Sequence, residues 1–492
     1  MPVNSTHPEY DANAASWLRA RDVFAGEDAV KSAGERYLPK LDSQSDDEYH
    51  AYKSRASFFN ATARTADGFV GLIFRREPVV RLAEKTTGVG VALAASADDL
   101  DLLGTSLSAY AKNVVAEVVS VGRCGTLVDW ENEGQQRAYA VLYQAEQIQN
   151  WRTARVNGRN ALTLLVLKEQ ATLQPSTFNG DHPTDEFESD TVEQLRVLKL
   201  EASGYEWRCV VELWQDLADG HRKKSKRGKT EWTKVETRIP LRLGKPLPLI
   251  PFVFHGPRHS LPLVDKLPLA DIITVNLDHY RLNADYKHGL HFTALPTAWV
   301  SGFDKGNELR IGSSTAWVAE TAGATAGFLE FTGQGLTTFE RAMDRDERLM
   351  AVLGTRMLEA QKRVGESADA IAMRQSGEDS VLGALAASIS DSLTQVLRWI
   401  HWWHSTEDKP DLVSTEDVLV SLNTDFSLQG MDSTAITALV SAWQARAISQ
   451  DTMLHCLRKG EVIPDGRTNE EEVRLVTSDK VLNQTTQPDV VK

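Results

Sequence analysis

The sequence predicts an α+β fold, in which helical and sheet-forming segments occupy separate stretches of one chain of 492 residues. Apolar residues recur at three- and four-residue spacing through residues 1–80, as on the buried face of a helix. Short segments rich in β-branched and aromatic residues follow between 126 and 241 and are typical of antiparallel strands. Two long helical patterns then flank a glycine-containing insert between 268 and 404. A chain of this length can bury a large core.

The N-terminal helical region is divided by Pro39, which interrupts a helix because it lacks a backbone N–H. A further amphipathic helix is expected over 98–121, with Asp98, Asp99 and Asp101 in its first turn, where the helix dipole favours negative charge. The same three carboxylates could form a metal cluster. The helix-start interpretation is favoured because it needs no further ligand.

Six segments of the second region are expected to be strands: TLVDW (from Thr126), RAYAVLY, ALTLLVLKE, QLRVLKLEA, WRCVVELWQ and TKVETRIPL. The basic segment HRKKSKRGK, residues 221–229, lies between the last two. A solvated hairpin loop is favoured there over phosphate contact or partner docking. The proline-rich stretch 244–268 ends the strand region.

A helix is expected over 268–292, with a broad, partly polar stripe typical of a helix that contacts neighbours on several sides. The stripe comprises Leu269, Ile272, Ile273, Asn276, Leu277, Tyr280, Leu282, Ala284 and Tyr286. Residues 295–333 combine repeated glycine with alternating apolar residues and predict a compact β-rich insert.

A second helix is expected over 336–358, capped by Thr337 or Thr338. Its charged residues lie three or four apart, which indicates solvation or ion pairs between subunits. They are Glu340, Arg341, Asp344, Arg345, Glu347 and Arg348.

Residues 359–367 interrupt this helix and place Lys362 and Arg363 in a break before Gly365. A long helix is then expected from Ser367 to His404, with Gly377 and Gly383 as points at which it could kink. It ends in a tryptophan cluster, Trp399, Trp402 and Trp403. His401 and His404 could ligate a metal, but no third ligand is visible, so packing and helix-end charge are favoured.

The C-terminal region begins with a linker at 406–411. It continues with a strand-like LVSLN and two helices, STAITALVSAWQARAI and SQDTMLHCLRKG, the second capped by Ser449 and stopped by Gly460 and Pro464. The polar tail from Thr477 is expected to be mobile.

The formal net charge is −14, which disfavours tight phosphate binding over a broad surface. It is compatible with an acidic passage through which nucleic acid slides, and equally with an ordinary acidic soluble protein. The three cysteines, Cys124, Cys209 and Cys456, are too sparse for a disulfide framework and indicate a reducing compartment. Neither a signal-peptide pattern nor an apolar run of about 18 residues is visible, so no membrane span is expected.

Catalytic motifs are mostly absent. The fragment Gly228-Lys229-Thr230 resembles the end of a phosphate-binding loop, but the required earlier glycine is replaced by Lys223. No HExxH, GxSxG or GxGxxG motif is present in a suitable context. A two-metal nuclease site could still assemble from scattered carboxylates, although nothing in the sequence favours one.

The order of segments resembles the portal proteins of tailed bacteriophages, particularly a branch from short-tailed and related phages. Three segments carry the resemblance: YLPKLDSQSDDEYHAYKSRASFFNATARTADGFVGLIFRREP (37–78), PLADIITVNLDHYRLNADYKHGLHFTALPT (268–297) and ISQDTMLHCLRKGEVIPDGRTNEEEV (448–473). The match is poorest over 80–265. The set of three is specific, whereas each segment alone is weak.

The resemblance implies the phage portal fold of a ring-forming subunit, divided into six regions. They are a wing at 1–265, a first stem helix at 266–294, a clip at 295–335, a second stem helix at 336–358, a tunnel loop and long tunnel helix at 359–405, and a crown with the C-terminal tail at 406–492.

The resemblance also implies a ring of twelve subunits at the unique capsid vertex, with a channel for double-stranded DNA during packaging and ejection. Its expected partners are the packaging terminase ATPase, which docks at the clip, the major capsid and scaffolding proteins, and a head–tail adaptor. The expected location is the portal vertex of the virion, and the host cytoplasm during assembly. No enzymatic activity, catalytic residue, cofactor, metal or membrane contact is implied.

Two sets of residues are expected to act in that layout. Lys362 and Arg363, together with Arg374, would touch DNA phosphates in the tunnel through weak, salt-sensitive contacts. For Lys362 and Arg363, a solvated charge pair at a helix end is an equal alternative. The stem set would face the channel or a neighbouring subunit: Arg281, Lys287, Arg341, Asp344, Arg345 and Glu347.

Two rival functions stay open from the sequence. One is a metal-dependent nuclease or other DNA-processing enzyme of a phage. The other is a different head–tail connector or capsid protein with no channel.

Changing both Lys362 and Arg363 to Glu tests the tunnel interpretation. Replacing two phosphate contacts by two like charges should impair DNA packaging or retention, because phosphates are then repelled. Rings seen by electron microscopy should stay intact. Normal packaging by this variant would remove the tunnel assignment.

Overall fold

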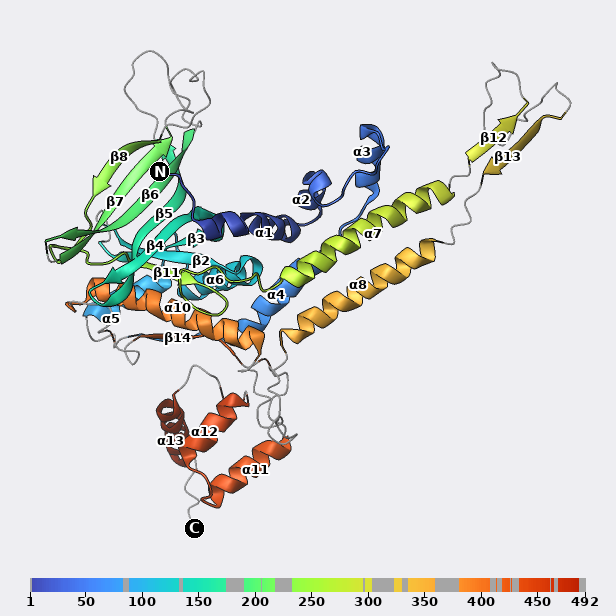
Figure 1. The fold of residues 1–492 in the computed structure, drawn as a ribbon. Coiled ribbons are helices and arrows are strands. Elements are labelled where there is room, and N and C mark those ends of the chain that lie inside the picture. The colour runs from blue at the N-terminus through green and yellow to red at the C-terminus, as the bar shows by residue number, and fades with distance from the viewer. Residues whose placement is uncertain are drawn as a thin grey trace, which may run out of the picture. The chain divides into compact units, whose positions relative to one another are not determined.

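The computed structural model describes residues 2–82, 88–131, 136–173, 190–204, 206–216, 232–294, 297–302, 323–329, 335–358, 380–407, 413, 418–424, 426, 433–460, 462–463 and 468–485. The fold mixes helices and sheets, as the sequence predicts (Figure 1). The chain forms two compact units. The first comprises Met1–Arg19, Ala66–Pro268 and Met357–Lys492, and the second comprises Ala20–Thr65 and Leu269–Arg356.

Two antiparallel sheets form the centre of the first unit. The larger has the order β4-β5-β6-β7-β8, so every strand pairs with its neighbour in sequence. Its strands are β4 (Ile148–Val156), β5 (Arg159–Leu173), β6 (Asp190–Ser203), β7 (Glu206–Asp216) and β8 (Trp232–Arg238). The smaller has the order β11-β2-β3 and consists of β2 (Cys124–Trp130), β3 (Ala138–Gln144) and β11 (Phe252–His255).

Helix α10 (Val381–His404) packs against the smaller sheet and against α5 (Gly88–Asp98) and α6 (Leu107–Val121). Ser380 caps its first turn by accepting a hydrogen bond from the Gly383 N–H. Most side chains between Leu382 and Trp403 are buried, because the helix contacts neighbours on several sides. The helix expected from Ser367 to His404 is not continuous, because Ser380, at the N-cap of α10, has an extended backbone; Gly383 lies in the first turn.

Arg242, in β9 (Leu241–Arg242), closes the other end of α10. Its guanidinium donates to the carbonyl oxygens of Trp402 at 2.9 Å and Ser405 at 2.7 Å, and it lies 4.2 Å from the Trp402 ring centroid. A cation at a helix C-terminus stabilises the last carbonyl groups, which have no partner within the helix.

A buried chain of hydrogen bonds links α6, the smaller sheet and α10. The Tyr110 hydroxyl lies 2.8 Å from Thr126 Oγ1, which lies 2.7 Å from His255 Nε2. His255 Nδ1 then lies 2.7 Å from Ser392 Oγ. Burial lowers the pKa of His255 to about 3, so the ring is neutral and both nitrogens serve the chain of contacts.

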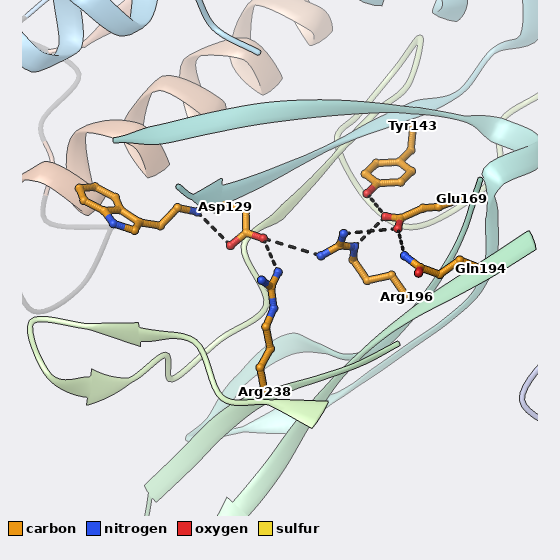
Figure 2. A network of polar contacts seen from close by, with 7 residues as sticks. Asp129, Tyr143, Glu169, Gln194, Arg196 and Arg238 are labelled. Carbon is orange, nitrogen blue, oxygen red and sulfur yellow. Dashed lines mark hydrogen bonds and ion pairs between the residues drawn. The ribbon is translucent and has the colours of Figure 1, made fainter. Parts of the chain in front are cut away.

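A network of charged groups joins the two sheets (Figure 2). Arg196 Nε donates to Glu169 Oε1 at 2.7 Å, and the same guanidinium lies 3.8 Å from Asp129. Arg238 donates to Asp129 at 2.8 Å. Tyr143 and Gln194 donate to Glu169 at 2.5 and 2.9 Å. Two carboxylates thus face two guanidinium groups, which satisfies the charges inside the protein.

The second unit contains the helix pair α7 (Ala270–Ala294) and α8 (Leu336–Arg356), with β12 (Thr297–Ser301) and β13 (Thr325–Leu329) between them in sequence. It also contains α2 (Glu27–Ser32), η1 (Gly34–Arg36) and α3 (Asp46–Arg55). Helices α1 (Pro8–Ala25) and α4 (Ala61–Ile73) each have residues in both units. A capping box between Ser45 and Glu48 starts α3.

The C-terminal part begins with β14 (Leu419–Ser421), which pairs antiparallel with β1 (Val79–Arg81). Helices α11 (Ser433–Gln444), α12 (Gln450–Lys459) and α13 (Asn469–Thr485) follow. Met453, Leu454 and Leu457 of α12 form a small core with Ile436 and Leu439 of α11. Ser449 caps α12 by accepting from the Thr452 N–H, as predicted.

The six expected strands are confirmed as β2, β3 and β5–β8. Strand β4 was not predicted, because the exposed charges of Arg152 and Arg155 obscure its apolar alternation. Strand β11 lies inside the proline-rich stretch that was expected to be non-strand. Its partner β2 supplies Gly125, where a Cβ would lie 2.2 Å from the Phe252 ring, so only glycine admits that ring.

Two other expectations are wrong. Asp98 ends α5, and the carboxylates of Asp99 and Asp101 accept backbone N–H groups of a loop, so they do not open a helix. Helix α6 begins after Ser106 instead. The tail expected to be mobile from Thr477 is helical as far as Thr485. The basic segment 221–229 lies outside the described residues, as do 315–320 and 359–379.

Replacing Arg196 by Ala should lower the free energy of unfolding by about 2–3 kcal/mol, because two partly buried carboxylates lose a compensating charge. Lys168→Ala is the matched control. Lys168 pairs with Glu193 on the same sheet, but both side chains are substantially exposed, so its loss should cost less than about 1 kcal/mol. Chemical denaturation measures both. Equal effects of the two substitutions would contradict the role given to the network.

Candidate functional site

The candidate site is the helix pair α7 and α8 with the β12–β13 ribbon. The two helices run side by side in opposite directions, and the ribbon follows the end of α7 and precedes α8 (Figure 1). At 1.5 Å per residue, the 25 residues of α7 span about 37 Å and the 21 residues of α8 about 31 Å. The pair is therefore an elongated element.

One face of α7 is apolar and buried, and it follows the stripe predicted from the sequence. The buried members are Leu269, Ile272, Ile273, Asn276, Leu277, Tyr280 and Ala284. Pro268 lies two residues before the first residue of the helix, Ala270.

Asn276 is the polar residue at the centre of this stripe and is fully buried. Its Nδ2 donates to the Phe59 carbonyl at 2.7 Å. Its Oδ1 accepts from the Thr62 hydroxyl at 2.8 Å and from the Thr62 backbone N–H at 3.2 Å. One side chain thereby satisfies three groups of a segment more than 200 residues earlier in the chain.

Two further contacts extend this attachment along α7. The Asn283 side-chain oxygen accepts from the Ser57 N–H at 2.8 Å. The Tyr52 hydroxyl donates to Asp285 at 2.5 Å, and burial together with that hydrogen bond raises the pKa of Tyr52. Residues 52–62 are therefore attached to α7 between Asn276 and Asp285.

Arg281 and Lys287, predicted for the channel or a neighbouring subunit, both have partners within the second unit. Arg281 donates to the Tyr37 carbonyl at 2.9 Å and to Asp278 at 2.6 Å. Lys287 donates to Ser57 Oγ at 2.5 Å. These contacts hold both cations against the N-terminal segment. A contact with DNA or with a neighbouring subunit would have to share a charged group that already has a partner.

The inner side of α8 contains a buried acid. Asp346 is 6% exposed, and burial raises the pKa of its carboxyl. Close by, His279 of α7 is also buried, and its Nε2 lies 3.4 Å from the exposed Glu347. Met350 and Gly354 complete the buried side of α8.

The predicted charges Arg341, Asp344, Arg345 and Glu347 all lie on the exposed part of α8. The Arg345 side chain is 83% exposed, and its Nε lies 4.0 Å from Asp346 Oδ1. The structure brings these four residues onto one helix surface. It separates them from Arg281 and Lys287, which lie on α7 with partners of their own.

The β12–β13 ribbon is a regular antiparallel pair in which Trp299 stands opposite Gly327. A Cβ at Gly327 would lie 3.0 Å from the Trp299 indole nitrogen, so the ring lies flat across the glycine. Trp299 is 45% exposed, and near the end of α7 Phe292 is 50% exposed. The end of α7 and strand β12 therefore each present an aromatic side chain to solvent.

Nothing in this arrangement matches a cofactor or catalytic centre. Within the described residues, no group of three or more His, Cys, Asp or Glu side chains is placed to hold a metal ion. His404 instead packs against Trp130, with ring centroids 5.2 Å apart, and its pKa is lowered by burial. The predicted tunnel residues Lys362, Arg363 and Arg374 lie outside the described residues.

Across the described residues, no helix combines the length and apolar character that a membrane crossing requires.

A family model described as a domain of unknown function (DUF4055) matches residues 268–404, less than half of the chain. That stretch begins just before α7 and ends with α10. No curated protein matches the chain.

Similar solved structures include two from gene transfer agent particles. One is a chain in the neck of an empty particle, with 10% identity, a TM-score of 0.34 and coverage of 81% of this chain and 90% of that chain. The other is a chain in the virion of a native particle, with 10% identity, a TM-score of 0.34 and coverage of 87% and 98% respectively. These scores are too low to establish a shared fold.

Sequence reasoning missed the part that residues 20–65 play in this site. They were expected in the wing, yet they belong to the same compact unit as α7 and α8. The available signal was Asn276, because a polar residue at the centre of an apolar stripe requires a buried partner.

Changing Asn276 to Ala should lower the stability of the second unit by about 3 kcal/mol, because the Phe59 carbonyl and the Thr62 N–H lose a buried partner. Hydrogen exchange should accelerate most in residues 57–66. Thr274→Ala on the exposed side of α7 is the control, since its hydroxyl bonds only the Ala270 carbonyl. Unchanged exchange in 57–66 would contradict the anchoring role.

Proposed function

We propose that this chain is a portal protein: a subunit of the ring at one vertex of a tailed phage or phage-like capsid, through which double-stranded DNA enters and leaves. The single observation that carries the proposal is the antiparallel pair α7 and α8 with the β12–β13 ribbon between them in sequence. This is the succession that the sequence resemblance assigns to stem, clip and stem.

The order of the remaining elements supports the same proposal. Helix α10, with 24 residues, follows α8 after the stretch that holds Lys362 and Arg363, as a tunnel loop and tunnel helix would. Helices α11, α12 and α13 then follow in the described part of the region assigned to the crown. The α/β part before Pro268 corresponds to the wing.

The proposed role is mechanical, and no covalent bond is made or broken by this chain. Twelve copies would form a closed ring, with the packaging ATPase supplying force from outside it. The clip would dock the terminase and later the head–tail adaptor. The exposed aromatic rings of Phe292 and Trp299 support such docking, because aromatic side chains are enriched at protein interfaces.

The acidic charge supports passage of DNA without tight binding. With a net charge of −14, long-range repulsion of phosphate limits adhesion of DNA to the protein. A few cations at a tunnel loop would give weak, salt-sensitive contacts to successive phosphates. DNA can slide when the protein as a whole repels phosphate and the tunnel loop contacts it only weakly.

Negative-stain microscopy and mass measurement of the purified full chain test this proposal. Closed rings with a central hole are expected. Twelve copies of the 54.5 kDa chain would weigh about 650 kDa. Monomers at every salt concentration and protein concentration would contradict the portal assignment.

Incubation of the same sample with plasmid DNA and Mg²⁺ or Mn²⁺ separates the proposal from a nuclease. The plasmid should stay uncut. Cleavage that is abolished by carboxylate substitutions would identify a nuclease instead.

A further inference from the structure

The solvent-facing surface of α8 has two parallel lines of opposite charge. The acidic ridge consists of Glu340, Asp344 and Glu347, and the basic ridge consists of Arg341, Arg345, Arg348 and Arg356; all seven residues are exposed. Within each ridge, the residues follow one another at spacings of three, four or eight. With 3.6 residues per turn, the two ridges lie roughly a third of a turn apart around the helix.

One side of α8 packs inside the protein. Its buried residues, Asp346, Met350 and Gly354, lie on the side opposite the basic ridge and next to the acidic ridge. Met343, on the same inner side, has its sulfur 4.0 Å from the side-chain nitrogen of Asn283 on α7. The basic ridge is therefore the part of α8 that α7 leaves uncovered, and the acidic ridge lies at the border of the contact between the two helices.

The ridge charges have few partners within the chain. Glu340 accepts a hydrogen bond from the Tyr286 hydroxyl at 2.7 Å, and Glu347 lies 3.4 Å from His279. Among the described residues, Arg341, Asp344 and Arg348 form no ion pair. The opposite charges within α8 thus do not neutralise one another.

We propose that the acidic ridge of one copy of this chain docks on the basic ridge of the next copy. The inference rests on the proposed ring, and it names the surface through which neighbouring subunits recognise one another. Because the two ridges lie on different flanks of α8, each copy offers one to each neighbour. Such a head-to-tail contact is repeated by every copy and closes when the rotation per subunit fits.

Apolar surface lies where the basic ridge would meet its partner. Leu349 is 39% exposed and Val352 is 45% exposed, and each stands four residues after an arginine of the ridge. Contact with a second copy would cover these side chains while the charges fix the register. Charge complementarity sets specificity, and apolar burial adds affinity.

Double-stranded DNA is the less suitable occupant of the same face. Phosphates drawn to the four arginines would meet three carboxylates on the adjacent ridge. A DNA-binding helix face normally has a clear surplus of positive charge. A second copy of this chain matches both signs at once.

Charge reversal in the full-length chain tests the docking. One variant carries Arg341→Glu and Arg345→Glu, and a second carries Glu340→Lys and Asp344→Lys. Each variant alone should lose rings at least tenfold relative to the wild type, because every interface then opposes like charges. The four substitutions in one chain should restore rings, since every interface again pairs opposite signs.

Mixing the two double variants provides an independent readout. At positions 340, 341, 344 and 345, one variant has four carboxylates and the other has four cations, so rings should form only from the mixture and contain equal numbers of each. Native mass measurement reads this composition. The matched control is Arg152→Glu with Arg155→Glu, which makes the same charge change at exposed positions of β4 and should leave rings intact.

The outcomes separate this inference from the ring itself. Wild-type protein without rings would remove the proposed function. Wild-type rings that persist in both double variants would overturn ridge docking alone. Intact rings with a selective loss of DNA binding in the arginine variant would assign the basic ridge to DNA. If a double variant is unfolded by circular dichroism, Arg345→Glu and Asp344→Lys, alone and combined, give the same comparison with one charge on each ridge.

Discussion

The hydrogen bonds between Asn276 and residues 59–62 are the constraint on which the second unit depends. A single helix in water is only marginally stable, and α7 becomes a fixed element because an earlier segment of the chain is attached along it. That attachment continues through Asn283 and Asp285, so one side of α7 is occupied between Asn276 and Asp285. Helix α8 packs against α7 and in turn acquires a defined inner and outer surface. The outer surface, with its separated charges, is then available for a partner.

The first unit holds two sheets and a long helix together around polar groups. His255 stays neutral between Thr126 and Ser392, so a buried ring adds no uncompensated charge. Arg196 lies between the carboxylates of Asp129 and Glu169 and connects strands of both sheets. These contacts lie inside the first unit and occupy the polar groups that make them. In the proposed portal they make a stable body, while recognition and passage of DNA fall to the exposed surfaces.

The sequence predicted elements whose cause is local. The apolar stripe of α7, the alternation in β5 to β7 and the Ser449 cap are all readable within one segment. Contacts between distant segments could not be read in this way. Tyr52 meets Asp285 across more than 230 residues, and the carbonyl of Tyr37 binds Arg281, which removes that arginine from the freely exposed set. Strand β11 forms between Pro251 and Pro257 because β2 has Gly125 where the Phe252 ring packs. The aspartates at 98–101 resembled a helix start because aspartate carboxylates accept backbone N–H groups in a loop as they do at a helix N-terminus.

A reconstruction of the particle that contains this chain, made without icosahedral averaging, tests the central claim most directly. The account predicts a single ring of this chain at one vertex, with DNA density in its hole in filled particles and an empty hole in particles that have released their DNA. A chain distributed over all vertices or through the shell would contradict it, as would a ring whose centre is closed in both states.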